Sequence, residues 1–165
     1  MENISVQEFK EMMRKGMIEN YETDGEITPI LFFLKDGKPH FVMIPPELFA
    51  SPEGKYTIAQ IIKNICVQPN VIAAGMIIEA FGAVIDNTHE NAEDIISGNK
   101  KISEIDERKD IIAMVFSTPE SEELIAYEVN EVTKEVGEQF GKNEDGTTNG
   151  GLSGLFSGFF NWNKN

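Results

Sequence analysis

The longest apolar run in the chain covers residues 70–85, and Glu79 is the one charge within it. The run is shorter than the about 20 residues that a membrane-spanning helix needs. Pro69 precedes it and two glycines interrupt it, which disfavours a helix, whereas its Ile, Val and Phe residues favour a pleated strand. The pattern therefore predicts a central strand that is buried on both faces.

A helical spacing of apolar residues begins near the N-terminus. Ser5 and Glu8 match a capping box, in which each side chain satisfies a backbone donor at the start of a helix. Apolar positions then recur every three or four residues, at Val6, Phe9, Met12, Met13 and Met17. The spacing predicts a helix with one narrow apolar stripe, lying across a larger element, in a segment that ends at Gly25.

The next two elements are a predicted hairpin and a predicted helix. Residues 29–34 and 40–44 are apolar and flank Asp36-Gly37, a dipeptide typical of a two-residue hairpin turn. Thr57 and Gln60 then match a second capping box. A helical stripe follows at Ile58, Ile61, Ile62, Ile65 and Cys66.

Residues 86–107 differ from the rest in holding seven acidic residues against Lys100 and Lys101. We interpret them as a long surface excursion with a helical turn around residues 94–96, and excursions of this length are often functional. The apolar runs 110–116 and 124–129 then predict a second hairpin.

The order of elements predicts an α+β fold for residues 1–140. We expect two layers, with a mainly antiparallel sheet of about five strands and two helices on one face. Residues 141–151 are polar and glycine-rich and predict a flexible linker.

The last segment, residues 152–165, is a Gly/aromatic tail. Its large apolar residues are Leu152, Leu155, Phe156, Phe159, Phe160 and Trp162. We interpret them as a docking peptide that fills pockets on a protein partner, so that the core would not need the tail for stability. The alternatives are that the tail folds back over its own sheet or stays disordered. A membrane-surface role is disfavoured because Lys164 is the only cation in the tail.

Charge narrows the classes of partner. The 165 residues include 28 acidic and 14 basic ones, for a formal net charge of -14. This balance disfavours nucleic acids and anionic membranes as partners, because both attract clustered Lys and Arg. The single cysteine, Cys66, cannot form an internal disulfide and fits a small core residue. The N-terminus lacks a signal peptide pattern, so we expect a cytoplasmic protein.

Several short motifs resemble those of small uncharacterised α+β proteins of bacterial and phage genomes. The motifs are the hairpin with its Asp-Gly turn, the apolar helix, Glu79-Ala80-Phe81 in the long strand, and Ser103-Glu104 to Arg108 before an apolar strand. The resemblance covers residues 27–130; it departs from the group at Phe81, where Trp is expected, and at Ile102, where Pro is expected. It implies the fold and a phage or prophage setting, and it implies no chemistry.

Residue patterns for common chemistries are missing from the sequence. His40, His89 and Cys66 are too widely separated to suggest a zinc site, and no stretch has the pattern of a calcium loop. No glycine-rich turn with a Lys opens a helix as a phosphate cradle would, and no nucleophile elbow is present. We therefore predict no cofactor, no metal and no catalytic residue.

Glu79 and Arg108 are the one pair that the sequence singles out. A carboxylate in an apolar strand is costly unless it is paired, and Arg can match it with two hydrogen bonds. We expect the two to form a structural bridge, or Glu79 to lie on a solvated face. An acid or base role for Glu79, assisted by His40, is the other reading.

Three functional hypotheses follow. The first is a non-enzymatic interaction or assembly module, such as a phage virion or accessory protein, whose partner is another protein or a second copy of itself. The second is an acidic inhibitor that imitates nucleic acid in the basic groove of a host enzyme. The third is a small enzyme that uses Glu79.

Overall fold

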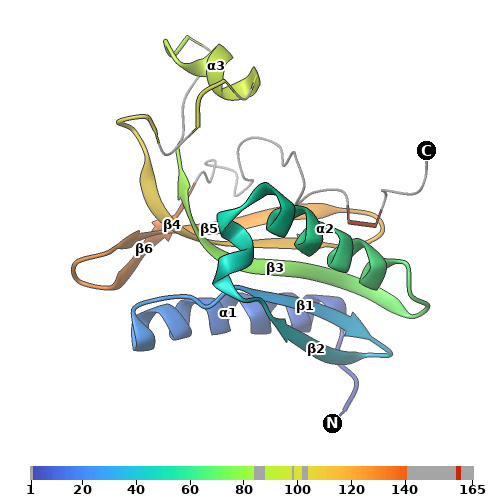
Figure 1. Ribbon diagram of the computed structural model, residues 1–165. Coiled ribbons are helices and arrows are strands. Elements are labelled where there is room, and N and C mark those ends of the chain that lie inside the picture. Colours follow the sequence, from blue (N-terminus) through green and yellow to red (C-terminus); the bar gives the residue numbers. More distant parts are fainter. Residues whose placement is uncertain (1, 84–87, 98, 102–103, 141–158, 161–165) are drawn as a thin grey trace.

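The computed structural model describes residues 2–83, 88–97, 99–101, 104–140 and 159–160. These residues build an α+β domain around one six-stranded sheet with the strand order β2-β1-β3-β4-β5-β6 (Figure 1). Every neighbouring pair of strands is antiparallel. The predicted linker, with Leu152, Leu155, Phe156 and Trp162 of the tail, lies outside the described residues.

The helices are α1 (Val6–Asp24), α2 (Pro52–Cys66) and α3 (Ala92–Ser97), and the short 3-10 helix η1 (Pro46–Ala50) precedes α2. The strands are β1 (Ile30–Lys35), β2 (Lys38–Met43), β3 (Val71–Gly82), β4 (Lys109–Ser117), β5 (Glu122–Asn130) and β6 (Glu135–Gln139).

The predicted α+β class, both hairpins and the long central strand are confirmed. The sheet has six strands instead of about five. The additional strand, β6, has the sequence Glu-Val-Gly-Glu-Gln, which offers one large apolar residue and therefore no apolar run to detect. The helical turn expected around residues 94–96 lies within α3.

Both long helices begin at a serine cap, and one of the two caps was predicted. Ser5 caps α1 as predicted, with its Oγ accepting the backbone N–H of Glu8 at 3.1 Å. The cap predicted at Thr57 is wrong, because α2 begins five residues earlier at Pro52. Ser51 caps it by accepting the Gly54 N–H at 3.0 Å, and proline at the first helical position has the right backbone angle already.

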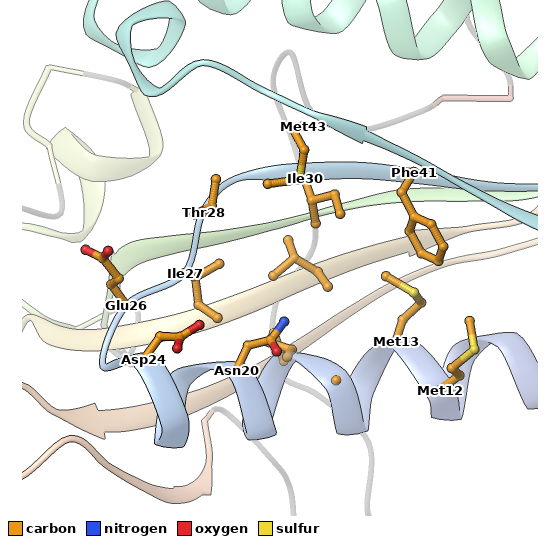
Figure 2. Close-up of a pocket in the computed structure, with 13 residues that line it drawn as sticks. Met12, Met13, Asn20, Asp24, Glu26, Ile27, Thr28, Ile30, Phe41 and Met43 are labelled. Atoms are coloured by element: carbon orange, nitrogen blue, oxygen red, sulfur yellow. The ribbon is translucent and has the colours of Figure 1, made fainter.

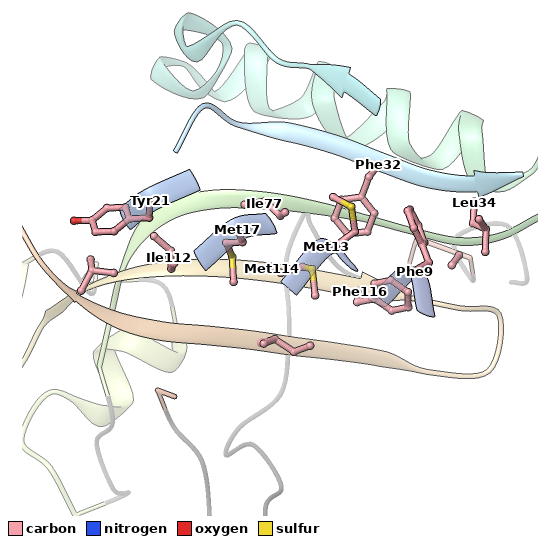
Figure 3. Close-up of a cluster of buried hydrophobic side chains, with 13 residues drawn as sticks. Phe9, Met13, Met17, Tyr21, Phe32, Leu34, Ile77, Ile112, Met114 and Phe116 are labelled. Atoms are coloured by element: carbon pink, nitrogen blue, oxygen red, sulfur yellow. The ribbon is translucent and has the colours of Figure 1, made fainter. Parts of the chain in front are cut away.

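The two long helices lie on opposite faces of the sheet, which corrects the expected two-layer arrangement (Figures 1 and 3). The α1 face is lined by Phe32, Leu34, Ala73, Ile77, Ile112, Met114 and Phe116. The α2 face is lined by Leu31, Ala74, Met76 and Val115. Because strand side chains alternate between faces, β1, β3 and β4 supply apolar residues to both. Each face therefore needs its own cover.

Phe159 completes the cover of the α2 face. It is fully buried against the side chains under α2, and Phe160 packs partly buried beside it. The two residues thus follow the alternative in which the tail folds back over its own sheet. Because the Phe159 side chain is fully buried, it has no exposed surface that a partner could contact.

Gly75 lets aromatic rings close over the middle of the α1 face. It lies beside Phe32 on β1 and Phe116 on β4, and those two rings stack above it with centroids 5.9 Å apart. Phe9 of α1 packs on them, with centroid distances of 5.5 and 6.1 Å (Figure 3). A β-carbon on Gly75 would collide with the Val115 carbonyl oxygen and the Phe32 ring. Glycine is therefore required by close packing.

Candidate binding groove

A groove lies between α1 and the β2 side of the sheet, with a volume of about 670 Å³ (Figure 2). We call it the methionine groove. From α1 it is lined by Met12, Met13, Gly16, Met17, Asn20 and Asp24, from the following connection by Glu26, Ile27 and Thr28, and from the sheet by Ile30, Phe41, Met43 and Ile77. Most of this lining is apolar.

The groove exists because α1 does not cover the full width of its face. Six strands about 4.8 Å apart span more than twice the roughly 10 Å diameter of a helix. Polar contacts attach α1 on its β5 side, where Lys10 Nζ lies 3.0 Å from a Glu123 carboxylate oxygen and Arg14 donates to the Tyr127 hydroxyl at 3.1 Å. The β2 side of the same face is thus left without a helix over it.

On α1, the groove wall is a column of residues spaced four apart. Met12, Gly16, Asn20 and Asp24 succeed one another on one side of the helix. A β-carbon built on Gly16 would meet no atom of the described residues within 4 Å. Glycine in a helix interior costs about 1 kcal/mol relative to alanine, so this position weakens α1 and widens the groove.

On the sheet, the groove rim is formed by the edge strand β2. Phe41 lies beside Phe32 and Met43 beside Ile30, which places both on the α1 face. Figure 2 shows Phe41 directed toward the α1 side, where Met13 rises from the helix. Both Phe41 and Met43 are exposed, and so is Met12 across the groove. Methionine side chains adapt their shape readily and are common at binding surfaces.

The groove is acidic at one end. Asp24 and Glu26 lie where α1 ends and the chain enters β1, while the other end is apolar (Figure 2). Arg14, the one Arg of α1, forms an ion pair with Glu11 at 2.8 Å, and its hydrogen bond lowers the pKa of the Glu11 carboxyl. The groove therefore combines apolar walls with an anionic end.

Glu79 lines a second pocket, of about 720 Å³, on the far side of the α1–β1 connection. Its carboxylate accepts the backbone N–H of Ile27, so it fixes the chain where it enters β1. Glu131 and Lys134, an ion pair at 3.1 Å, lie in the same lining. Glu79 is exposed, as one of the sequence readings had it.

The structure does not bring Glu79 and Arg108 together. Glu79 pairs with Ile112 across β3 and β4, and Arg108 lies beyond Lys109, whose partner is Gly82. Arg108 instead donates to the Ile105 carbonyl at 3.2 Å and lies over the Phe81 ring, 5.9 Å from its centroid. The strand register, which the sequence did not give, separates the two charges.

The remaining candidate residues are also dispersed. His40 stacks on Phe33 at a centroid distance of 4.8 Å, on the α2 face, and so lies on the other side of the sheet from Glu79. Cys66, the last residue of α2, is buried, and burial raises the pKa of its thiol to about 12. His89 instead pairs with Glu107 in the acidic excursion, at 2.7 Å.

Metal ligands do not gather anywhere in the described part of the chain: no three His, Cys, Asp or Glu side chains are grouped so that they could hold an ion. Among the same residues, no helix is long and apolar enough to span a membrane.

Comparisons with protein-family models, with curated proteins and with solved structures give no match in any of the three. Sequence reasoning had missed the groove. Two signals could have indicated it: the glycine inside an amphipathic helix, and the unbroken Phe41-Val42-Met43 in a strand that directly follows a hairpin turn.

Proposed function

We propose that this protein is a non-enzymatic interaction module, and that the methionine groove is where it binds an apolar segment of another protein. The observation that carries the proposal is the combination of Gly16 with exposed Met12, Phe41 and Met43 around one groove. Leaving large apolar side chains in water is unfavourable by about 1.5 to 3 kcal/mol each relative to burial. A partner that covers them recovers that free energy.

This proposal moves the binding surface from the tail to the groove. The tail was expected to dock on a partner, but Phe159 packs on its own sheet and so contributes to the fold. The resemblance to proteins of bacterial and phage genomes supports an assembly or accessory role as the setting. An apolar groove with an anionic end fits a protein segment that carries apolar side chains and a basic residue.

A variant that fills the groove from α1 tests the proposal. Gly16→Trp places a large ring in open space, so α1 should still fold while the groove is blocked. A photo-crosslinking residue at position 43, on the groove rim, should give one discrete adduct in the producing cells. That adduct should fall at least about tenfold in the Gly16→Trp background.

Position 132 supplies the matched control. Val132 is an apolar residue, 91% exposed, in the turn between β5 and β6 and outside the groove lining. The same crosslinker there should give no discrete adduct. Equal adducts from both positions, or an adduct of position 43 with another protein that persists when Gly16 is Trp, would contradict binding in the groove.

A further inference from the structure

The two edges of the sheet differ sharply. At one edge, β6 is five residues long, carries Glu135 and Glu138, and shifts its register against β5. Charges and irregularities of this kind protect an edge strand from pairing with another chain. At the other edge, β2 pairs with β1 in unbroken register over six residues, and Phe41 and Met43 are 51% and 61% exposed. Lys38 and Pro39 protect the turn end of β2, whereas its other end carries neither charge nor proline.

The hairpin turn determines which backbone groups of β2 point outward. Asp36 and Gly37 form the two-residue turn with φ angles of 54° and 73°, and Lys35 pairs with Lys38 across it. In an antiparallel pair, hydrogen-bonded and non-hydrogen-bonded positions alternate from that closing pair. The backbone of His40 and Val42 therefore bonds to β1.

Three residues of β2 direct their backbone away from β1. They are Pro39, Phe41 and Met43, by the same alternation. Proline has no N–H, so the outward donors are those of Phe41 and Met43, and the outward acceptors are all three carbonyls.

We propose that β2 pairs with β2 of a second copy of this chain, in antiparallel register centred on Phe41. In this register each Phe41 N–H donates to the Phe41 carbonyl of the other copy. Each Met43 N–H donates to the Pro39 carbonyl opposite, whereas each Met43 carbonyl receives no ladder bond in return, because Pro39 has no N–H. Two six-stranded sheets become one, with two-fold symmetry.

The charges at the two ends of β2 favour a second copy of this chain as the strand that pairs with it. They also favour antiparallel pairing. β2 begins at Lys38, and its far end leads through two prolines to Glu47. Lys38 shares the α2 face with His40 by alternation, and Leu48 and Phe49 place η1 on that face too. Antiparallel pairing brings the Lys38 end of each strand to the Glu47 end of the other, twice over. Parallel pairing would align like charges.

The dimer goes beyond the proposed function, because it uses the backbone edge and leaves the α1 wall of the groove uncovered. Both Phe41 side chains remain on the α1 face, about 5.5 Å apart between α-carbons in a hydrogen-bonded pair. The two methionine grooves then adjoin across the symmetry axis.

The test measures the oligomeric state of the full chain by analytical ultracentrifugation from about 1 to 200 µM. We expect a concentration-dependent dimer for the natural sequence. Phe41→Pro removes the outward N–H without removing a bond to β1, and Phe41→Thr is its matched control with the N–H kept. Dimerisation should be at least about tenfold weaker for Phe41→Pro than for Phe41→Thr, while circular dichroism shows both folded.

A charge exchange tests the direction of pairing. Lys38→Glu and Glu47→Lys should each weaken self-association, because each places like charges together at both ends. Mixed together, the two variants should form a heterodimer, visible by native mass spectrometry, because both contacts then join opposite charges. A monomer at 200 µM, a dimer that tolerates Phe41→Pro as well as Phe41→Thr, or no gain on mixing would overturn the inference. A crosslink from position 43 to a second copy of this chain would report the dimer, whereas an adduct with another protein that Gly16→Trp removes reports the groove, so the two proposals can fail separately.

Discussion

Cys66 is the last residue of α2 and lies among the side chains that this helix packs on the sheet. Because burial disfavours the thiolate, the pKa of the thiol rises from 9.0 to about 12. The folded protein thus holds this proton more tightly than the unfolded chain does. The residue behaves as a small apolar side chain, in agreement with the sequence prediction, and its reactivity should be low.

The raised pKa predicts how stability depends on pH. The contribution of the protonated thiol is fully present below about pH 9 and is lost as the pH rises toward 12. Between pH 7 and 10 the loss should be on the order of 1 kcal/mol. Urea unfolding across this range measures it, and Cys66→Ala is the control. If the natural protein and Cys66→Ala lose stability in parallel, the thiol is not the cause.

At the scale of elements, β3 organises the fold because it is apolar on both faces. Ala73 and Ile77 pack on the α1 side, and Ala74 and Met76 pack on the α2 side. Gly75 lies where three aromatic rings need the space. The strand can therefore accept one helix on each side. The effect of a substitution on stability should therefore depend on how closely the neighbouring side chains pack at that position.

Two identical glycine substitutions should have opposite effects. Gly75→Ala should destabilise the protein by at least about 2 kcal/mol, because the new methyl group collides with the Val115 carbonyl and the Phe32 ring. Gly16→Ala should stabilise it by up to about 1 kcal/mol, because the methyl group enters open space on a helix. Thermal and chemical unfolding of both variants measures the difference. Similar effects at the two positions would contradict the packing described for Gly75.

The sequence predicted those features that neighbouring residues decide. The Asp36-Gly37 turn and the Ser5 cap depend on a few adjacent residues, and both were found where expected. The two-sided burial of β3 was also predicted, and it already implied cover on both faces. The prediction that both helices lie on one face ignored this, and it was wrong.

Features decided by distant pairing escaped prediction. Glu79 and Arg108 are separated by the β3–β4 register, and the polar strand β6 forms because β5 offers it an edge. The groove escaped too, since its lining comes from α1, the connection after it and three strands. Its shape depends on where α1 comes to rest, and spacing along one helix does not give that position.

At the scale of the whole molecule, Phe159 brings a late part of the sequence into the core. Phe159 is fully buried among residues from β1, β3, β4 and α2, although Phe140, the end of the preceding described stretch, lies 19 positions earlier. Residues near both ends of the chain thus take part in the packing, Phe9 on one face and Phe159 on the other.

Phe159→Ala should therefore lower the free energy of unfolding by about 3 kcal/mol, as expected when a buried aromatic side chain is removed. Phe160→Ala is the matched control, and because Phe160 is only partly buried its loss should be clearly smaller. Urea unfolding with both variants provides the measurement. An unchanged midpoint for Phe159→Ala would return the tail to the role of an independent docking peptide.

The position of α1 has a consequence for synthesis on the ribosome. This helix is made before every strand of the sheet, yet its apolar side packs on Met114, Ile125 and Val129 of β4 and β5, which are made more than 100 residues after Phe9. The β1–β2 hairpin can form early, whereas α1 must wait for most of the chain to emerge. During that interval its methionine and phenylalanine side chains are exposed to chaperones, and such distant contacts slow folding.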